Sequence, residues 1–128
     1  MSEERENLYQ YLAEIARRSF EGEINWTQPN PSTFQWVQET DDELYVTTIQ
    51  KASMPHTAGN LQGLKSLKDS YRKSVYLFQV QDKRKRQVLL SLSTRDRNDV
   101  YEPLERIYEA AEKGMDVRAS NILKKLLN

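Results

Sequence analysis

The sequence predicts an α+β domain in which one helix precedes an antiparallel meander of about four strands and two helices complete the chain. Three observations support this fold class. The chain opens with an amphipathic helical pattern, continues with short runs of β-branched and aromatic residues, and returns to helical periodicity near residue 98. Its 128 residues are enough for one hydrophobic core and too few for two ordinary domains, so we predict a single domain, residues 1–128.

The first helix is predicted over about residues 3–20. Leu8, Leu12 and Ile15 fall on one helical stripe, and Phe20 extends that stripe. Glutamates at positions 3, 4 and 6 place negative charge in the first turn, where the helix dipole favours it. Gly22 predicts the end of the helix.

Four strand-like runs follow. Pro29 and Pro31 exclude a helix and force extended or turn geometry around Asn30. The runs "TFQWVQE" and "ELYVTTIQK" flank an acidic turn, "TDDE", and the runs "SVYLFQVQ" and "RQVLLSLST" form a second pair. Residues 52–70 carry two glycines and a proline, which indicates a loop.

The pentapeptide "DKRKR", residues 82–86, connects the second pair of strands. We expect Tyr76, Phe78 and Val80 on one face of the hairpin, with Val88, Leu90 and Leu92 lining the matching face of its second strand. The turn has no Gly or Asn, so a connection longer than a two-residue primed turn is predicted. Its cations suit a turn that projects into water and deters the edges of two sheets from pairing. We favour this interpretation over contact with phosphate.

The last part of the chain predicts two helices. Asn98 or Asp99 caps the first, Pro103 lies in its first turn, and Gly114 ends it. Its buried stripe is Val100 or Tyr101 with Leu104, Ile107, Tyr108 and Ala111. Asp116 caps the second helix, whose expected buried stripe is Val117, Ile122, Leu123 and Leu126.

Four segments carry a resemblance: "LAEIARRSFEGEINW", "STFQW", "YLFQVQDKRKRQVLLSL" and "LERIYEAAEKGMDVRASNILKKLL". With them the chain resembles small bacterial domains of unknown function that occur alone, beside or fused to effector modules. The resemblance implies a non-enzymatic accessory or interaction domain. The chain departs from that pattern in its longer 52–70 loop and in having Lys and Arg where the hairpin tip of the pattern favours Gly.

Composition argues against most catalytic chemistry. The absence of cysteine excludes disulfides, thiolate catalysis and Cys-ligated metals, and the single histidine, His56, supports neither a metal site nor a catalytic triad. The segment "GNLQGLKS", residues 59–66, has the wrong spacing for a phosphate-binding P-loop. We therefore expect no enzyme, cofactor or metal. No membrane-spanning run or signal peptide is apparent, and cytoplasmic localisation is expected.

Charge is unevenly distributed although the net charge is zero. Residues 1–50 hold 10 acidic and 3 basic side chains, residues 51–97 hold 3 acidic and 11 basic, and the remainder hold 6 acidic and 5 basic. Such asymmetry indicates either a basic binding face or two halves that attract each other within or between molecules. We favour the second interpretation.

Two functions are open at this point, and an enzyme that uses His56 is a third, weaker option. The preferred one is protein binding, by self-association as a homodimer or by adaptor contact in a bacterial or phage cytoplasm, through an apolar sheet face. That face would present Val37, Val75, Leu77 and Leu89. The alternative is recognition of a phosphate-bearing ligand, nucleic acid or a small nucleotide, by two basic loops. Those loops would use Lys65, Lys68, Arg72, Lys73, Lys83, Arg84, Lys85 and Arg86.

Overall fold

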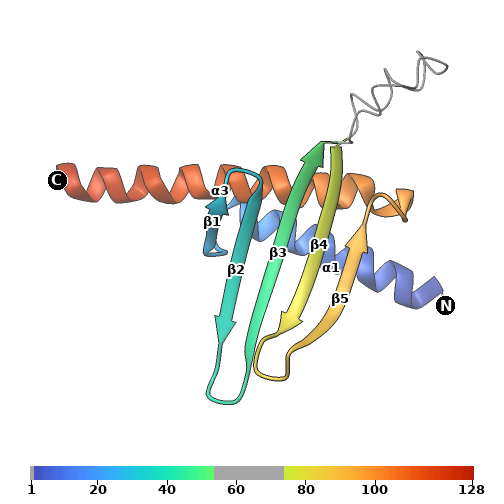
Figure 1. Cartoon of the computed structure of the whole chain (residues 1–128). Helices are drawn as coiled ribbons and strands as arrows, with labels where there is room; N and C mark the ends of the chain where they lie inside the picture. Colours follow the sequence, from blue (N-terminus) through green and yellow to red (C-terminus); the bar gives the residue numbers. More distant parts are fainter. Residues whose placement is uncertain (1, 54–73) are drawn as a thin grey trace, which may run out of the picture.

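The computed structural model describes residues 2–53 and 74–128 and has the predicted α+β class (Figure 1). Its elements are α1 (Ser2–Phe20), β1 (Trp26–Asn30), β2 (Thr33–Glu39), β3 (Leu44–Ser53), β4 (Ser74–Asp82), β5 (Gln87–Ser93), the 3₁₀ turn η2 (Asn98–Val100) and α3 (Tyr101–Leu127). In this part of the chain the strands form one antiparallel sheet in sequence order, β1-β2-β3-β4-β5. Most of the 52–70 loop, His56 and the "GNLQGLKS" segment lie outside the described residues.

Helix α1 forms where it was predicted, but Phe20, which was expected to extend its stripe, is 57% exposed. Leu12 is buried at 1% exposure, and the partly buried Leu8 and Ile15 pack against the same core. Gly22 follows the helix with φ +78°, a left-handed conformation that glycine adopts without the Cβ clash other residues meet. The chain can therefore turn directly from α1 into the sheet.

Strand β1 was not among the predicted strands, because its prolines argued for a turn. Pro29 nevertheless lies within β1, which is an edge strand of the sheet. Proline is tolerated in an edge strand because such a strand has a hydrogen-bonded neighbour on one side only. Asn30 then closes the turn into β2, with its Oδ1 accepting a hydrogen bond from the Ser32 N–H at 3.1 Å. The described part of the chain therefore forms a sheet of five strands rather than about four.

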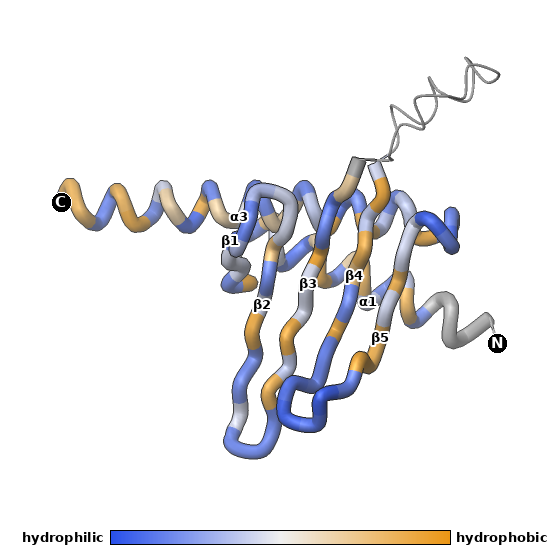
Figure 2. The backbone as a smooth tube through the Cα atoms, viewed as in Figure 1, coloured by the Kyte–Doolittle hydropathy of each residue, from blue (hydrophilic) through white to orange (hydrophobic). Residues whose placement is uncertain are grey.

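The helices cover one face of the sheet, and the core lies between them. A cross-strand row runs through Phe34, Ile49, Phe78 and Leu92, one residue from each of β2 to β5, and all four are at most 3% exposed. Tyr108 of α3 packs edge-on against Phe34, with ring centroids 5.0 Å apart. Figure 2 shows the apolar residues alternating along these strands.

A β-bulge in β5 corrects the predicted core face of the hairpin. Leu90 pairs with Val80, but Val88 pairs with Gln81, so Leu89 is the extra residue between two consecutive positions of β4. The bulge moves Val88 to the face opposite the helices, where it is 57% exposed. The prediction that Val88 lines the core with Leu90 and Leu92 is therefore wrong.

The two predicted C-terminal helices are one continuous helix, α3. Gly114 lies inside it, not at its end, at a point where the backbone of α3 packs directly against the backbone of Ser19 in α1. A side chain at position 114 would collide with α1, so glycine serves close packing here and not helix termination. Asn98 and Asp99 lie in η2, while Val100 is the N-cap of α3 and makes no side-chain capping bond.

Neither α1 nor α3 contains a stretch apolar enough to cross a bilayer, as far as the described residues extend.

Candidate functional site

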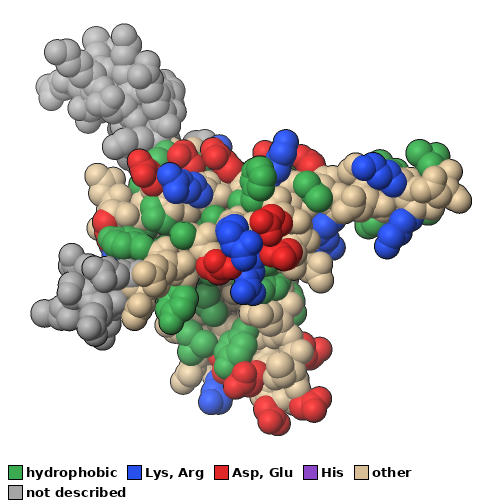
Figure 3. All heavy atoms as spheres, turned by 180° about the vertical axis from the view of Figure 1, so that it is seen from behind, with side chains coloured by type: hydrophobic (Ala, Val, Ile, Leu, Met, Phe, Trp, Pro, Cys, Tyr) green, Lys and Arg blue, Asp and Glu red, His purple; other side chains and the backbone are tan. Residues whose placement is uncertain are grey.

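The last turns of α3 project beyond the sheet, and we call residues 119–127 the α3 overhang (Figures 1 and 3). The last hydrogen bond between α3 and the sheet is donated by the Arg118 guanidinium to the Trp26 carbonyl of β1 at 3.1 Å. Strand β1 is the outermost strand on this side of the described sheet, so no strand of residues 2–53 and 74–128 lies under the residues that follow Arg118. All of them are exposed.

The overhang carries an uncovered apolar stripe. Its four large apolar side chains are Ile122, Leu123, Leu126 and Leu127, which are 54%, 58%, 75% and 86% exposed. At 100° per residue, Ile122 and Leu126 share the face of α3 that holds the buried Leu104 and Ala111 over the sheet. The stripe that packs on the sheet thus continues past the point where the sheet ends.

This exposure corrects the prediction that Ile122, Leu123 and Leu126 form a buried stripe. The prediction assumed a separate helix that folds back onto the core, whereas the continuous α3 carries these side chains past β1. The helical pattern itself was visible in the sequence. The pattern could not show how far the sheet extends beneath the helix.

The sheet face opposite the helices is only partly apolar. Val37 lies there in a cross-strand row with Val46, Gln81 and Val88. A second row, Gln35, Thr48, Gln79 and Ser91, is polar, and the Gln79 side chain donates a hydrogen bond to the Ser91 hydroxyl at 3.2 Å.

The four residues predicted to form an interaction surface do not make one patch. Leu77 and Val75 lie on the same face as Val37 but on the other side of the polar row, and both are half-buried. Leu89 is the bulge residue and has no cross-strand partner. The structure therefore brings Val75 and Leu77 together and separates them from Val37 and Leu89.

The basic turn of residues 83–86 lies beside the acidic turn of residues 40–43. The Arg84 guanidinium donates a hydrogen bond to the Asp41 carbonyl at 2.7 Å and approaches the Glu39 carboxylate at 3.5 Å. The buried Asp82 carboxylate accepts the backbone N–H groups of Arg84 and Lys85, each at 3.1 Å. The turn is the longer connection that was predicted, and its charge faces opposite charge within the same molecule.

Only half of the predicted phosphate-binding residues lie in the described part of the chain. Lys83, Arg84, Lys85 and Arg86 form the basic turn, with Arg84 engaged as above. Lys65, Lys68, Arg72 and Lys73 lie outside the described residues.

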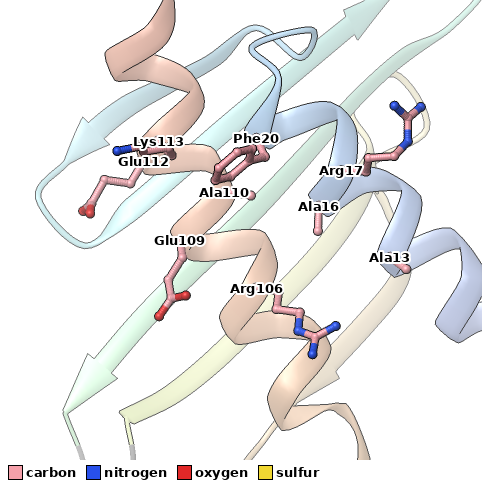
Figure 4. Close-up of a pocket in the computed structure, with 9 residues that line it drawn as sticks. All are labelled: Ala13, Ala16, Arg17, Phe20, Arg106, Glu109, Ala110, Glu112 and Lys113. Atoms are coloured by element: carbon pink, nitrogen blue, oxygen red, sulfur yellow. The ribbon is translucent and has the colours of Figure 1, made fainter.

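A groove of about 550 Å³ runs along the outer seam between α1 and α3 (Figure 4). Ala13, Ala16 and Ala110 line it with the exposed ring of Phe20, and charged side chains of both signs surround it. Arg17 on its rim is already paired with Glu14 and Glu21. Hydrogen bonds from Arg17 and Arg18 lower the pKa of Glu14 to about 2.

The groove does not have the composition of a catalytic centre. Its carboxylates and cations lie at the exposed surface of two helices, and none of the described residues that line it is a histidine or cysteine. Within residues 2–53 and 74–128, no three or more His, Cys, Asp or Glu side chains are grouped to hold a metal ion. Among the described surfaces, the α3 overhang is the candidate site with the clearest physical signal.

Comparisons with protein-family models, curated proteins and solved structures found no match to this chain. The resemblance to small bacterial domains therefore stays a prediction.

Proposed function

We propose that this chain is a protein-binding domain that self-associates through the α3 overhang and performs no catalytic step of its own. One observation carries the proposal: four large apolar side chains, each more than half exposed, lie on consecutive turns of a regular helix. Contiguous apolar patches of this kind mark contact sites on soluble proteins, whereas apolar residues scattered singly do not. The expected setting remains a bacterial or phage cytoplasm.

The overhang supports self-association better than the sheet face does. A polar row divides the apolar residues of the sheet face, and its outer groups already bond one another. The overhang has no polar row across it. Lys124 lies on the opposite side of the helix from Leu126, and Lys125 lies about 60° from Ile122, on the side away from Leu126, so Lys125 borders the stripe without dividing it. We therefore assign the contact to the helix rather than to the sheet.

Phosphate binding is the less supported alternative. Charged groups of the acidic turn compete with any polyanion for the basic turn, and Arg84 is already engaged by Glu39 and Asp41. A hairpin end with nearby opposite charges attracts polyanions weakly, because its field cancels at a distance.

Light scattering of the purified protein over a concentration series tests the proposal. We expect the mass to rise toward twice the monomer mass as concentration increases, equally at low and high salt, because apolar contacts are not screened. Adding a short mixed-sequence oligonucleotide should leave the mass unchanged. A monomer that gains mass only with oligonucleotide, and only at low salt, would instead support the phosphate-binding alternative.

A further inference from the structure

The α3 overhang leaves a step at the β1 edge of the sheet. At a rise of 1.5 Å per residue, residues 119–127 extend about 13 Å past Arg118, and an α-helix with side chains is about 10 Å wide. Ile122 and Leu126 continue the sheet-facing stripe of α3, so their side chains point into this step. The step has room for one further helix beneath the overhang.

An added strand would not fill the step well. The Trp26 carbonyl accepts its hydrogen bond from Arg118 at 3.1 Å, and the Trp26 N–H donates to the Ile24 carbonyl at 2.9 Å. Pro29 has no N–H to offer. With both backbone groups of Trp26 engaged and no N–H at Pro29, the outer edge of β1 is poorly suited to pairing with another strand, and a helix fits the step better than a strand does.

We infer that the step is filled by the α3 overhang of a second copy of this chain, packed antiparallel across a two-fold axis; this inference rests on the proposed function. In such an isologous pair each overhang both covers the other and enters its step. The register that aligns the stripes places Ala119 against the partner's Leu126 and Ile122 against the partner's Leu123. Small residues then oppose large ones at the ends, and large residues meet at the axis.

The area of the stripe sets the expected strength of the pair. Four such side chains form a patch in the range of roughly 300–600 Å² that is typical of functional surfaces. A standard stable interface buries about 800 Å² on each partner. The pair is therefore expected to be a weak dimer in exchange with monomer, with a dissociation constant in the micromolar range or weaker.

Cysteine cross-linking tests the arrangement, because the chain has no cysteine of its own. L123C places a thiol beside the axis, and N121C, two residues earlier, places one on the opposite side of the helix. With a short bis-maleimide, we expect L123C to form a covalent dimer at least ten times faster than N121C. Equal rates in a protein that still has dimer mass would overturn the arrangement and leave the proposed function standing. Monomer mass at every concentration would overturn both.

A charge pair tests the same register without cysteine. I122E and L123K should each be monomeric, because each buries a charge against an apolar side chain twice in the homodimer. An equimolar mixture should regain dimer mass, since Glu at 122 then faces Lys at 123 of the other chain while the second contact remains apolar. Parallel pairing would not bring these positions together, so a mixture that stays monomeric would overturn the antiparallel register if the unsubstituted chain dimerises.

Discussion

Gly114 of α3 lies directly against the backbone of Ser19 in α1. A Cβ at position 114 would lie 2.0 Å from the Ser19 carbonyl oxygen and 3.1 Å from its carbonyl carbon. No side-chain rotation relieves such a clash, because both partners are backbone atoms. The two helices can therefore cross this closely only with glycine at 114, and this crossing orients the α3 overhang relative to the sheet.

We expect G114A to lower the free energy of unfolding by at least about 1 kcal/mol. Alanine gains about 1 kcal/mol in helix propensity, but forcing extra volume into a packed contact typically costs about 1–3 kcal/mol and more where backbone must move. Urea unfolding followed by circular dichroism measures the difference. The exposed neighbour provides the control, K113A, which should stay within about 0.5 kcal/mol of the unsubstituted protein. A stabilised G114A would show that the helices are not held this closely.

Ser19 also holds the first strand to α1. Its hydroxyl accepts a hydrogen bond from the Trp26 indole N–H at 2.7 Å and donates one to the Ile15 carbonyl at 2.6 Å, and both Ser19 and Trp26 are buried. S19A leaves the indole N–H without its partner, which we expect to cost about 1–3 kcal/mol. S120A, on the exposed overhang, should have almost no effect. Equal unfolding midpoints for the two variants would contradict the role given to this hydrogen bond.

Arg86 occupies a conformation that favours glycine. Its φ of 55° is in the left-handed region, at the last position of the basic turn. A Cβ atom destabilises this backbone conformation, and glycine has none. We therefore expect R86G to stabilise the protein by about 0.5–1 kcal/mol. K85G, one residue earlier, should not stabilise it. A destabilised R86G would mean that the Arg86 side chain makes a contact worth more than the strain.

Asp99 links α1 to the start of α3 and should make stability depend on pH. Its carboxylate accepts hydrogen bonds from Arg97 at 2.6 Å and from the Tyr9 hydroxyl at 2.6 Å. These bonds, that of Arg97 foremost, hold the pKa of Asp99 well below its ordinary value of 3.8. A carboxyl group with a lowered folded-state pKa contributes stability that is complete above its unfolded-state pKa and is lost as the pH falls toward the folded-state value.

D99N should therefore destabilise the protein at pH 7 and change it little near pH 2. The loss at neutral pH should not exceed about 1 kcal/mol, because the Asp99 and Arg97 side chains are 40% and 37% exposed and solvent screens the pair. Urea unfolding at pH 7, 4 and 2 gives the comparison, with D42N in the exposed acidic turn as control. An unchanged pH profile in D99N would exclude this carboxylate as a source of acid sensitivity.

Much of the fold follows from residue patterns, and the differences from prediction have local physical causes. Helix α1 and strands β2 to β5 follow from apolar spacing because each buries one face. Alternation alone could not reveal the bulge at Leu89, since Val88, Leu89 and Leu90 are all apolar and every register looks equally good. Gly114 was interpreted as a helix end because close helix crossing and helix termination both favour glycine.

The candidate site was harder to predict than the fold. Ile122, Leu123 and Leu126 have the periodicity of a buried stripe, and only the position of β1 beneath α3 shows that nothing in the described part of the chain covers them. For the charged turns, the sequence indicated that two halves of opposite charge attract each other. The ion pair between Arg84 and Glu39, the last residue of β2, is one local instance of that attraction.

Sedimentation equilibrium of two matched double variants tests the central claim most directly. L123E/L126E places charge on the α3 overhang, and V37E/L77E places the same charges on the open face of the sheet. We predict that the unsubstituted protein and V37E/L77E share one monomer–dimer equilibrium, while L123E/L126E remains monomeric with an unchanged circular dichroism spectrum. Loss of the dimer in V37E/L77E alone, with L123E/L126E still dimeric, would contradict dimerisation through the α3 overhang and would show that the sheet face is the contact surface.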